Sequence, residues 1–423
     1  MSKIPPSLRQ SLTARLETLR LRLADPQAQI PLLILGLVSG AVAGLSMVIF
    51  RLVIEASPAL LLGADNPEDH EHLTPWWRLI LPTLGGLAVG LLLQRLEPAR
   101  RQVGVVHVLE RLSYSEGHLP LSNAGVQFVG AALCILSGHS IGREGPSIHI
   151  GAASGSWMGQ RLHLPNNSIR ILVGCGSAGA IAAAFNTPLA GVIFAMEVIL
   201  MEYTLTGFVP IIAAAVAATT VSRWAFGQDP VFIAPDVGLD SLADLGYVLI
   251  MGVLIGALSA AFFRLLVMIT RQFRRIPIWL RATAAGAATG ILALWAPQVM
   301  GIGYDTVNQA LLGELGLGLL LGILAAKLAA TSLALGLGLP GGLIGPTLVM
   351  GAMAGGAAGL LLDLYAPVDT SPALYATRGM GAMMGATLKA PLAALTALLE
   401  LTNNPHVIMP GMLAVVAASV TAH

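Results

Sequence analysis

The sequence predicts an all-α integral membrane protein made of two related halves with broken, tilted helices. Composition is the first indication, because 55% of the 423 residues are hydrophobic, 11% are charged and the mean hydropathy is +0.78. Soluble domains carry about 25% charged residues. The second indication is a set of apolar runs close to the roughly 20 residues that cross a bilayer core. The third is an internal repeat that relates most of the chain to itself.

The repeat is clearest in two glycine-rich segments that lie 200 residues apart. GREGPSIHIGAASG occupies residues 142–155 and GLIGPTLVMGAMAG occupies 342–355, so that four glycines and one proline coincide. Two further pairs recur in the same order: QVGVVHVLERL at 102–112 with GIGYDTVNQAL at 301–311, and FNTPLAGVIFAME at 185–197 with LKAPLAALTALLE at 388–400. A duplicated apolar chain with glycine-broken helix starts is typical of transporters and channels with a binding site near the membrane midplane.

The polar segments divide the chain into four parts. We expect a cytoplasmic N-terminal amphipathic segment at 1–29, a first membrane repeat at 30–225, a linker at 226–245 and a second membrane repeat at 246–423. The first segment is rich in lysine and arginine, which favours the cytoplasmic side, and its leucines recur at helical spacing. The first apolar run is too long for the core of a signal peptide. A net charge of +1 gives no indication of a nucleic-acid partner.

The apolar runs predict two kinds of helix. Those long enough to span a bilayer are 30–50, 79–93, 247–266, 278–295 and 317–337. Those that predict partial or strongly tilted spans are 171–185, 189–201, 380–388 and 392–401. Broken helices are tolerated at membrane depth only where protein or a watery cavity satisfies the freed backbone groups. The expected fold is therefore a thick helical bundle around an interior pathway.

The repeated glycine segments also predict an anion site. Glycine leaves the backbone uncovered where a helix begins, and proline suits the first turn because its missing N–H would have no partner there. The free N–H groups and the positive end of the helix dipole then face the gap and favour an anion. The alternative is that these glycines only allow close packing between helices.

Glu144 lies inside the first glycine segment, whereas Ile344 takes the equivalent place in the second. A carboxylate at an anion-binding helix start can occupy the site when ionised and leave it when protonated, so Glu144 is a candidate gate. An ionisable residue within the membrane is a functional candidate by default. The alternative is a salt bridge with the neighbouring Arg143.

Three motifs resemble those of the CLC chloride channels and chloride/proton antiporters. GREGP at 142–146 matches the family signature, PGGLIGP at 340–346 is similar to its second anion-binding loop, and FNTPLAGVIFAME at 185–197 follows a third family pattern. The resemblance covers nearly all of residues 30–421. It implies a CLC-type fold of two inverted-topology repeats and a homodimer with one pathway per subunit. It also implies a multi-pass protein of a bacterial inner membrane, with a cytoplasmic N-terminus.

The resemblance implies roles for particular residues. Glu144 resembles the external gating glutamate. The chloride ligands of the family, mainly backbone amides, fall on Arg143, Gly145, Leu343, Ile344 and Gly345. The resemblance implies no catalytic residue, metal or cofactor. The expected partners are chloride and other small monovalent anions, protons and the lipid bilayer.

Three departures from the family pattern concern the inner half of the pathway. The central anion-binding serine falls on Val103, next to Gly104, so no hydroxyl is available there. The inner proton-relay glutamate of the antiporters falls on Val198, and Glu202, expected about one helical turn away, is a substitute candidate. The family's pore tyrosine belongs to a helix that would follow the last matched residues.

These departures favour passive or weakly proton-coupled transport of chloride and similar anions, gated by protonation of Glu144. A fully coupled chloride/proton antiporter is the alternative. Another intramembrane carrier, or an enzyme, is a less favoured alternative, since neither an HExxH nor a GxSG motif occurs. The residues therefore predict a transporter or channel and not an enzyme.

Four other polar residues have structural interpretations. Glu197 and Glu400 occupy equivalent places in the repeat and are predicted to cap or brace helices. Lys327 is predicted to neutralise a cluster of carbonyl groups or a carboxylate, with contact to a passing anion as the alternative. His149 follows Glu144 by just over one turn and is either a packed, hydrogen-bonded side chain or a proton carrier.

Overall fold

The computed structural model describes residues 29–423 apart from 63–69, 71–72, 229, 233–243 and 366–371. Within these residues the chain is helical, and its one pair of extended residues is an isolated bridge between Gly142 and Gly342. The helices of the first half are α2 (Gln29–Leu62), α3 (Pro75–Arg95), α4 (Gly104–Tyr114), α5 (Leu121–Leu136), α6 (Glu144–Arg161), α7 (Asn166–Phe185), α8 (Pro188–Phe194), the π-helical turn η2 (Ala195–Leu200) and α9 (Leu205–Phe226).

The second half repeats this series. Its helices are α10 (Asp244–Gln272), α11 (Ile278–Trp295), α12 (Tyr304–Leu311), α13 (Leu317–Gly336), α14 (Ile344–Tyr365), α15 (Pro372–Leu388), α16 (Pro391–Thr402) and α17 (Ile408–Thr421). Short 3₁₀ turns precede α4, α12 and α17 at Pro98–Arg101, Pro297–Val299 and Pro405–Val407. The predicted all-α membrane fold is confirmed.

Eight of the described helices are long and apolar enough to cross a bilayer. The five long runs expected from the sequence all lie in such helices, namely α2, α3, α10, α11 and α13. The sequence predicts residues 171–185 as a partial or strongly tilted span, and the partial alternative is wrong, because α7 begins five residues earlier and has 20 residues. The helices α8 and α16 have 7 and 12 residues, as expected for broken spans.

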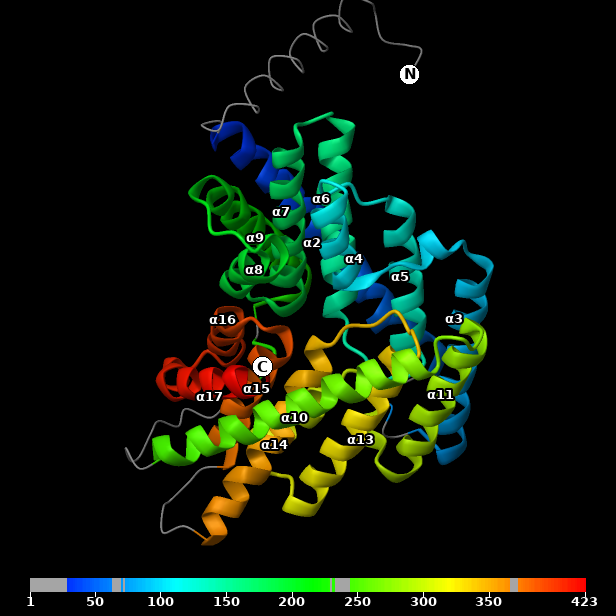
Figure 1. Cartoon of the computed structure of the whole chain (residues 1–423), viewed down its shortest axis with the longest axis vertical. Helices are drawn as coiled ribbons and strands as arrows, with labels where there is room; N and C mark the ends of the chain where they lie inside the picture. Colours follow the sequence, from blue (N-terminus) through cyan, green and yellow to red (C-terminus); the bar gives the residue numbers. More distant parts are fainter. Residues whose placement is uncertain (1–28, 63–69, 71–72, 229, 233–243, 366–371) are drawn as a thin grey trace, which may run out of the picture.

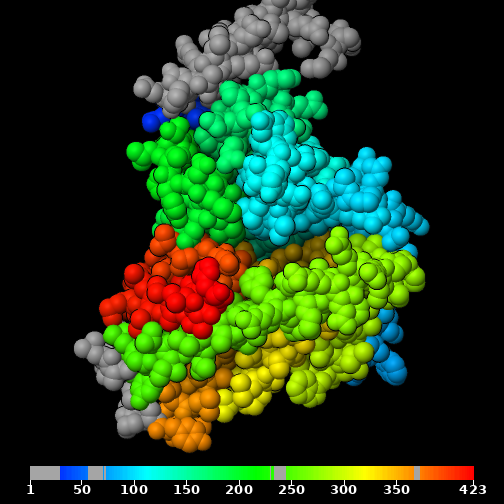
Figure 2. Space-filling model, in the orientation of Figure 1, coloured from blue at the N-terminus to red at the C-terminus, as the bar shows by residue number. Residues whose placement is uncertain are grey.

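The packing of the first half recurs in the second. Helix α7 packs on α2, α6 and α9, and α15 packs in the same way on α10, α14 and α17. Figure 1 shows α6, α7 and α9 in the upper part of the molecule and α10, α14 and α17 in the lower part. The halves meet where equivalent elements touch each other, α3 against α11, α8 against α16 and α6 against α14. In the space-filling view the two halves meet along a boundary across the molecule (Figure 2).

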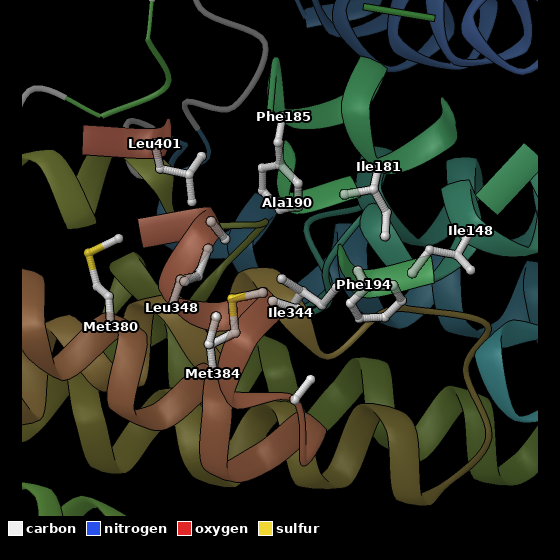
Figure 3. Packing of buried hydrophobic residues seen from close by; sticks show 14 of the residues in the cluster. Ile148, Ile181, Phe185, Ala190, Phe194, Ile344, Leu348, Met380, Met384 and Leu401 are labelled. Carbon is white, nitrogen blue, oxygen red and sulfur yellow. The ribbon is translucent and has the colours of Figure 1, made fainter. Parts of the chain in front are cut away.

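The core between the halves is an apolar cluster drawn from both (Figure 3). The first half contributes Ile148, Ile181 and Phe194, and the second half contributes Ile344 and Met384, all at most 5% exposed. Within a bilayer such side chains hold helices together through close packing, because lipid tails are as apolar as they are. This cluster lies beside the start of α14 and therefore holds the two glycine segments in one place.

A backbone bridge joins those two segments directly. The amide of Gly142 donates to the carbonyl of Gly342 at 2.9 Å, and the amide of Gly342 donates to the carbonyl of Gly142 at 2.8 Å. The chains approach so closely that a Cβ on Gly342 would lie 2.6 Å from the nitrogen of Gly145. A Cβ on Gly145 would lie 2.7 Å from the Cα of Gly342. The glycines are therefore required by the contact between the halves.

The boundaries of the four expected parts stay a prediction. The amphipathic segment at 1–29 lies outside the described residues except for Gln29, and most of the linker at 226–245 does so as well. Helix α10, the first of the second half, begins at Asp244, within the last two residues of the expected linker.

Replacement of Gly342 by alanine tests the close approach of the two segments. The added methyl group would overlap the backbone at Gly145, and overpacking of this kind costs about 1–3 kcal/mol. We expect a lower midpoint of thermal unfolding in detergent for Gly342→Ala. Gly318→Ala is the matched control, because a Cβ at Gly318 in α13 meets nothing within 4 Å. Equal midpoints for the two variants would contradict the required contact.

Candidate functional site

The candidate site lies where α6 and α14 begin, on either side of the glycine bridge. The first helical hydrogen bonds run from Ser147 N to Arg143 O and from Thr347 N to Leu343 O, both 3.0 Å long. The amide groups earlier in each first turn have no acceptor within their own helix. Two helix starts of opposite halves thus place free N–H groups and positive dipole ends together. This is the chemistry of an anion site.

The carboxylate of Glu144 already occupies such a position. The side chain is fully buried. One carboxylate oxygen, Oε2, accepts a hydrogen bond at 3.1 Å from the backbone N–H of Gly345 in the other half. The other oxygen, Oε1, accepts a hydrogen bond from the hydroxyl of Tyr304. An anionic group from the first half therefore caps the first turn of α14 in the second half.

Tyr304 is a site residue that the sequence did not indicate. It is the first residue of α12 and is 6% exposed. Its ring packs against Phe232 and Phe185, with centroid separations of 5.4 and 6.3 Å. The repeat aligns Tyr304 with Val105, so the internal comparison marks the segment but gives no reason to expect a hydroxyl there. The surrounding rings fix the hydroxyl at the Glu144 carboxylate.

Arg143 extends toward α2 and α7. Its Nη1 lies 3.9 Å from the carboxylate of Glu55, and its Nη2 donates to the carbonyl of Ala184 at 3.4 Å. Its guanidinium carbon also lies 5.3 Å from the centre of the Tyr304 ring. Arg143 therefore supports the walls of the site, and the backbone supplies the contact with the carboxylate.

The remaining backbone positions expected from the resemblance are neighbours in the chain of Glu144 or of Gly345, which contacts its carboxylate. Oε2 of Glu144 lies 3.4 Å from the point that a Cβ on Gly345 would occupy. Ile344 is 3% exposed and Leu343 is partly buried, while Gly145 packs against Gly342. The structure therefore brings Glu144, Gly145 and the start of α14 into one place.

Val103 and Gly104 form the start of α4. Val103 precedes the helix, and Gly104 has a φ of +82°, a left-handed conformation that favours glycine. The equivalent Gly303 before α12 has a φ of +88°. Each of these turns is accompanied by one long polar side chain, Gln127 in the first half and Lys327 in the second, whose end comes within 4 Å of a Cβ placed on the glycine.

Lys327 is fully buried and hydrogen-bonds to backbone carbonyl groups. Its ammonium group donates to the carbonyl of Gly301 at 2.9 Å and to that of Val299 at 3.2 Å. These bonds agree with the predicted role of neutralising a carbonyl cluster.

The two candidates for the inner proton route are separated by the end of a helix. Val198 lies within the π-helical turn η2, which ends at Leu200. Met201 then adopts a left-handed conformation with φ +55°, so the chain leaves the helix before Glu202. The expected helical spacing between Val198 and Glu202 is therefore wrong. The Glu202 side chain is 61% exposed and lies 3.5 Å from Arg170 in a cavity that Leu32 and Asn166 also line.

Glu197 and Glu400 each cap the start of a helix in the opposite half. The Glu197 carboxylate accepts from the amides of Leu392 and Ala393 at the start of α16, at 3.2 and 2.7 Å. The Glu400 carboxylate accepts from the amides of Leu189 and Ala190 at the start of α8, at 3.0 and 2.7 Å. The predicted capping role is confirmed. Among the described residues, no group of three or more His, Cys, Asp or Glu side chains could hold a metal ion.

Comparison with known proteins gives a consistent result. The model of a family described as voltage gated chloride channel matches residues 85–423. A putative chloride channel protein ClcB-like of Ralstonia nicotianae is 33% identical over 414 residues, 93% of each chain. The voltage-gated ClC-type chloride channel ClcB of Escherichia coli is 32% identical over 92% of this chain and 94% of its own. The H(+)/Cl(-) exchange transporter ClcA of Vibrio cholerae is 32% identical over 67% of this chain and 63% of its own.

Solved structures share the fold. A slow cyanobacterial Cl⁻/H⁺ antiporter superimposes with a TM-score of 0.79 at 25% identity, over 92% of this chain and 94% of that one. A CLC-type fluoride/proton antiporter superimposes with a TM-score of 0.78 at 22% identity, over 93% and 96%.

Neutral replacement of the two capping carboxylates tests their structural role. Glu197→Gln and Glu400→Gln each replace an ionised acceptor of two amides with a neutral one. Hydrogen bonds to charged groups contribute about 1.5–3 kcal/mol each. We expect each variant to lose about 1–2 kcal/mol of stability, measured by thermal unfolding in detergent. Glu314→Gln, at an exposed position, controls for loss of one negative charge. Unchanged stability in both capping variants would contradict the bracing role.

Proposed function

This chain belongs to the voltage-gated chloride channel family, and we propose that it moves chloride and similar small monovalent anions across a membrane, with Glu144 as the gate. The pathway passes the starts of α6 and α14, one pathway in each subunit of a homodimer in the bacterial inner membrane. In this arrangement α2 begins on the cytoplasmic side. No step makes or breaks a covalent bond in the anion, so the protein acts as a transporter and not as an enzyme.

The observation that carries this proposal is the position of the Glu144 carboxylate on the amide of Gly345. We call the position at the Gly345 N–H the seat. A seat that binds a carboxylate through a backbone N–H at a helix start also suits chloride. The ionised side chain and the anion therefore compete for one place. When Glu144 takes up a proton, it loses the charge that favours this place, and an anion can replace it.

The neutral donors of the seat suit a transporter. Backbone amides and helix dipoles supply partial positive charge. A site must bind an ion strongly enough to accept it and weakly enough to release it. Arg143 directs its guanidinium toward Glu55 and Ala184, so its charge is shared with groups outside the seat. At the start of α4, Val103 offers no hydroxyl, and selectivity among small anions should be correspondingly loose.

We further propose that the anion movement is coupled to protons. The Glu144 carboxylate either carries a proton or occupies the seat. Protonation of Glu144 is therefore linked to entry of the anion. The exchange activity named for the Vibrio cholerae relative and for the cyanobacterial structure supports this choice. Passive conduction is the second candidate, and the absence of a carboxylate at Val198 favours it. The two differ in one measurable property, because only the coupled protein moves protons uphill when chloride runs downhill.

Glu144→Gln tests the gate. Glutamine is neutral at every pH and resembles the protonated carboxyl group. We expect the chloride efflux of wild-type proteoliposomes to rise as the pH falls, because protonation releases the gate. Efflux through Glu144→Gln should persist and vary little with pH. In the wild type a chloride gradient should also drive uphill proton movement, and the variant should abolish it.

Glu314→Gln serves as the control and should behave like the wild type. A pH profile that is the same in Glu144→Gln and in the wild type would contradict the gate. A wild type that moves chloride but no protons would support passive conduction instead.

Tyr304→Phe tests the hydroxyl that holds the gate. The change keeps the ring but removes the donor to Glu144. A hydrogen bond to a charged group contributes about 1.5–3 kcal/mol, so the carboxylate should leave its seat more readily. We expect chloride efflux at neutral pH to rise by about tenfold or more, since 1.4 kcal/mol corresponds to a factor of ten. Tyr203→Phe, which removes an exposed hydroxyl, is the control. Unchanged efflux in Tyr304→Phe would show that the hydroxyl does not restrain the gate.

A further inference from the structure

Two histidines form a buried pair beside the candidate pathway. Nδ1 of His107 in α4 lies 3.0 Å from Nε2 of His149 in α6, and the ring centroids are 5.1 Å apart. His107 is 3% exposed and His149 is fully buried. In Figure 1 the two helices that carry them lie beside each other in the upper half. No other part of the site described above uses these side chains.

One buried nitrogen of the pair is not used in a hydrogen bond. Nδ1 of His149 is buried and has no hydrogen-bond partner among the described residues. The neighbours of the pair along each helix, Val108 and Ala152, belong to the apolar core. Burial of an unpartnered polar atom among apolar side chains is unfavourable. A packing role alone therefore does not account for an imidazole at this place, whereas a role in binding a proton or a water molecule does.

Polar side chains continue from the pair toward one end of α4. His107 and then Glu110 and Arg111 follow each other at spacings of three or four residues, which places them on one side of the helix. Val103 lies at the end that borders the proposed central site. Glu110 is exposed and lies one turn beyond His107, next to Arg111.

The C-terminal end of α4 lies on the side of the molecule where α2 begins. Arg170 donates to the carbonyl of Leu112 near the end of α4 and lines the same cavity as Leu32 in the first turns of α2. This is the side that we propose is cytoplasmic. The stripe on α4 therefore runs from the middle of the pathway to the cytoplasmic surface.

We propose that His107 and His149 form a proton relay between the pathway and the cytoplasmic side, in place of the carboxylate that Val198 lacks. The inference rests on the proton coupling in the proposed function. The turn η2, which contains Val198, packs against α4, so the relay passes close to the position it replaces. Glu144 and His149 lie five residues apart, about 7.5 Å along the axis of α6. Because Glu144 faces α14 and His149 faces α4, water in the pathway must bridge them.

Each transfer moves one proton through the pair. At the start, His149 carries its proton on Nε2 and donates it to Nδ1 of His107, which carries its own proton on Nε2. A proton from the pathway binds to Nδ1 of His149, the Nε2 proton of His149 passes to Nδ1 of His107, and the Nε2 proton of His107 leaves to Glu110 or water. Both rings end neutral, each with its proton on Nδ1, and the hydrogen bond between them is reversed. Exchange with water, in which each ring releases its Nδ1 proton and takes up one proton on Nε2, restores the starting state.

Other charged groups lie on the helices that pack around the pair. The elements that pack on α4 or α6 are α2, α5, α7, α14 and η2. The titratable or charged side chains on these elements, on α6 itself and directly before it are Arg51, Glu55, Cys134, Arg143, Glu144, Arg161, Arg170, Cys175, Glu197, Asp363 and Tyr365. Among the residues that the structure describes, each imidazole is hydrogen-bonded to the other imidazole and not to a carboxylate, so both can remain neutral between transfers.

Coupled flux in proteoliposomes tests the relay with the full-length protein. Chloride efflux and chloride-driven proton uptake are measured together for the wild type, His107→Gln and His149→Gln. Glutamine can accept and donate hydrogen bonds but cannot carry an added proton at neutral pH. We expect chloride efflux within about twofold of the wild type and at least a tenfold fall in protons moved per chloride. His118→Gln, at the loop after α4, is the matched control and should keep wild-type coupling.

A second variant separates loss of the route from damage to the fold. Val198→Glu in the His149→Gln background places a carboxylate at the position used by the antiporters that the sequence resembles, and it should restore proton movement. Unchanged coupling in both single histidine variants would overturn the relay while leaving the proposed function intact. Parallel loss of chloride efflux would assign the pair a packing role and also overturn the relay. Absence of proton movement in the wild type would refute the coupling itself, and the relay with it.

Discussion

The reciprocal hydrogen bonds between Gly142 and Gly342 are the constraint on which the rest of the structure depends. They set two helix starts from opposite halves at backbone contact, a separation that admits no side chain on Gly145 or Gly342. Because Gly142 and Gly342 directly precede the first turns of α6 and α14, the same contact that joins the halves also brings the unsatisfied donors of those turns together. The choice between close packing and anion binding for these glycines is therefore not exclusive, since the packing creates the anion seat.

Carboxylates complete this arrangement by crossing from one half to the other. Glu197 and Glu400 cap helices of the opposite half, and Glu144 does the same at the start of α14. The first two carboxylates each accept two backbone amides. Glu144 instead shares its contacts between one amide and the hydroxyl of Tyr304. A carboxylate held partly by a side chain is more readily displaced than one held by two backbone groups, which suits a gate better than a brace.

The sequence predicted the frame of the site but not all of its contents. The repeated glycines, the position of Glu144 and the capping roles of Glu197 and Glu400 follow from local pattern and from the resemblance. Tyr304 could not be predicted, because nothing in its segment indicates what its hydroxyl reaches across the molecule. The spacing assumed for Glu202 failed because a π-helical turn and the left-handed residue after it end the helix early. The pairing of the two histidines depends on the packing of α4 on α6, and it could not be predicted from spacing along one helix.

The two halves share a backbone plan, and their side chains break its symmetry. The left-handed glycines before α4 and α12 and the starts of α6 and α14 are equivalent in conformation. At matching positions, however, Glu144 opposes Ile344 and Tyr304 opposes Val105. The titratable groups of the candidate site, including the histidine pair, therefore lie predominantly in the first half. A symmetric frame would treat the two membrane faces alike, so the unequal placement of proton-binding groups is what gives the proposed pathway an inner and an outer end.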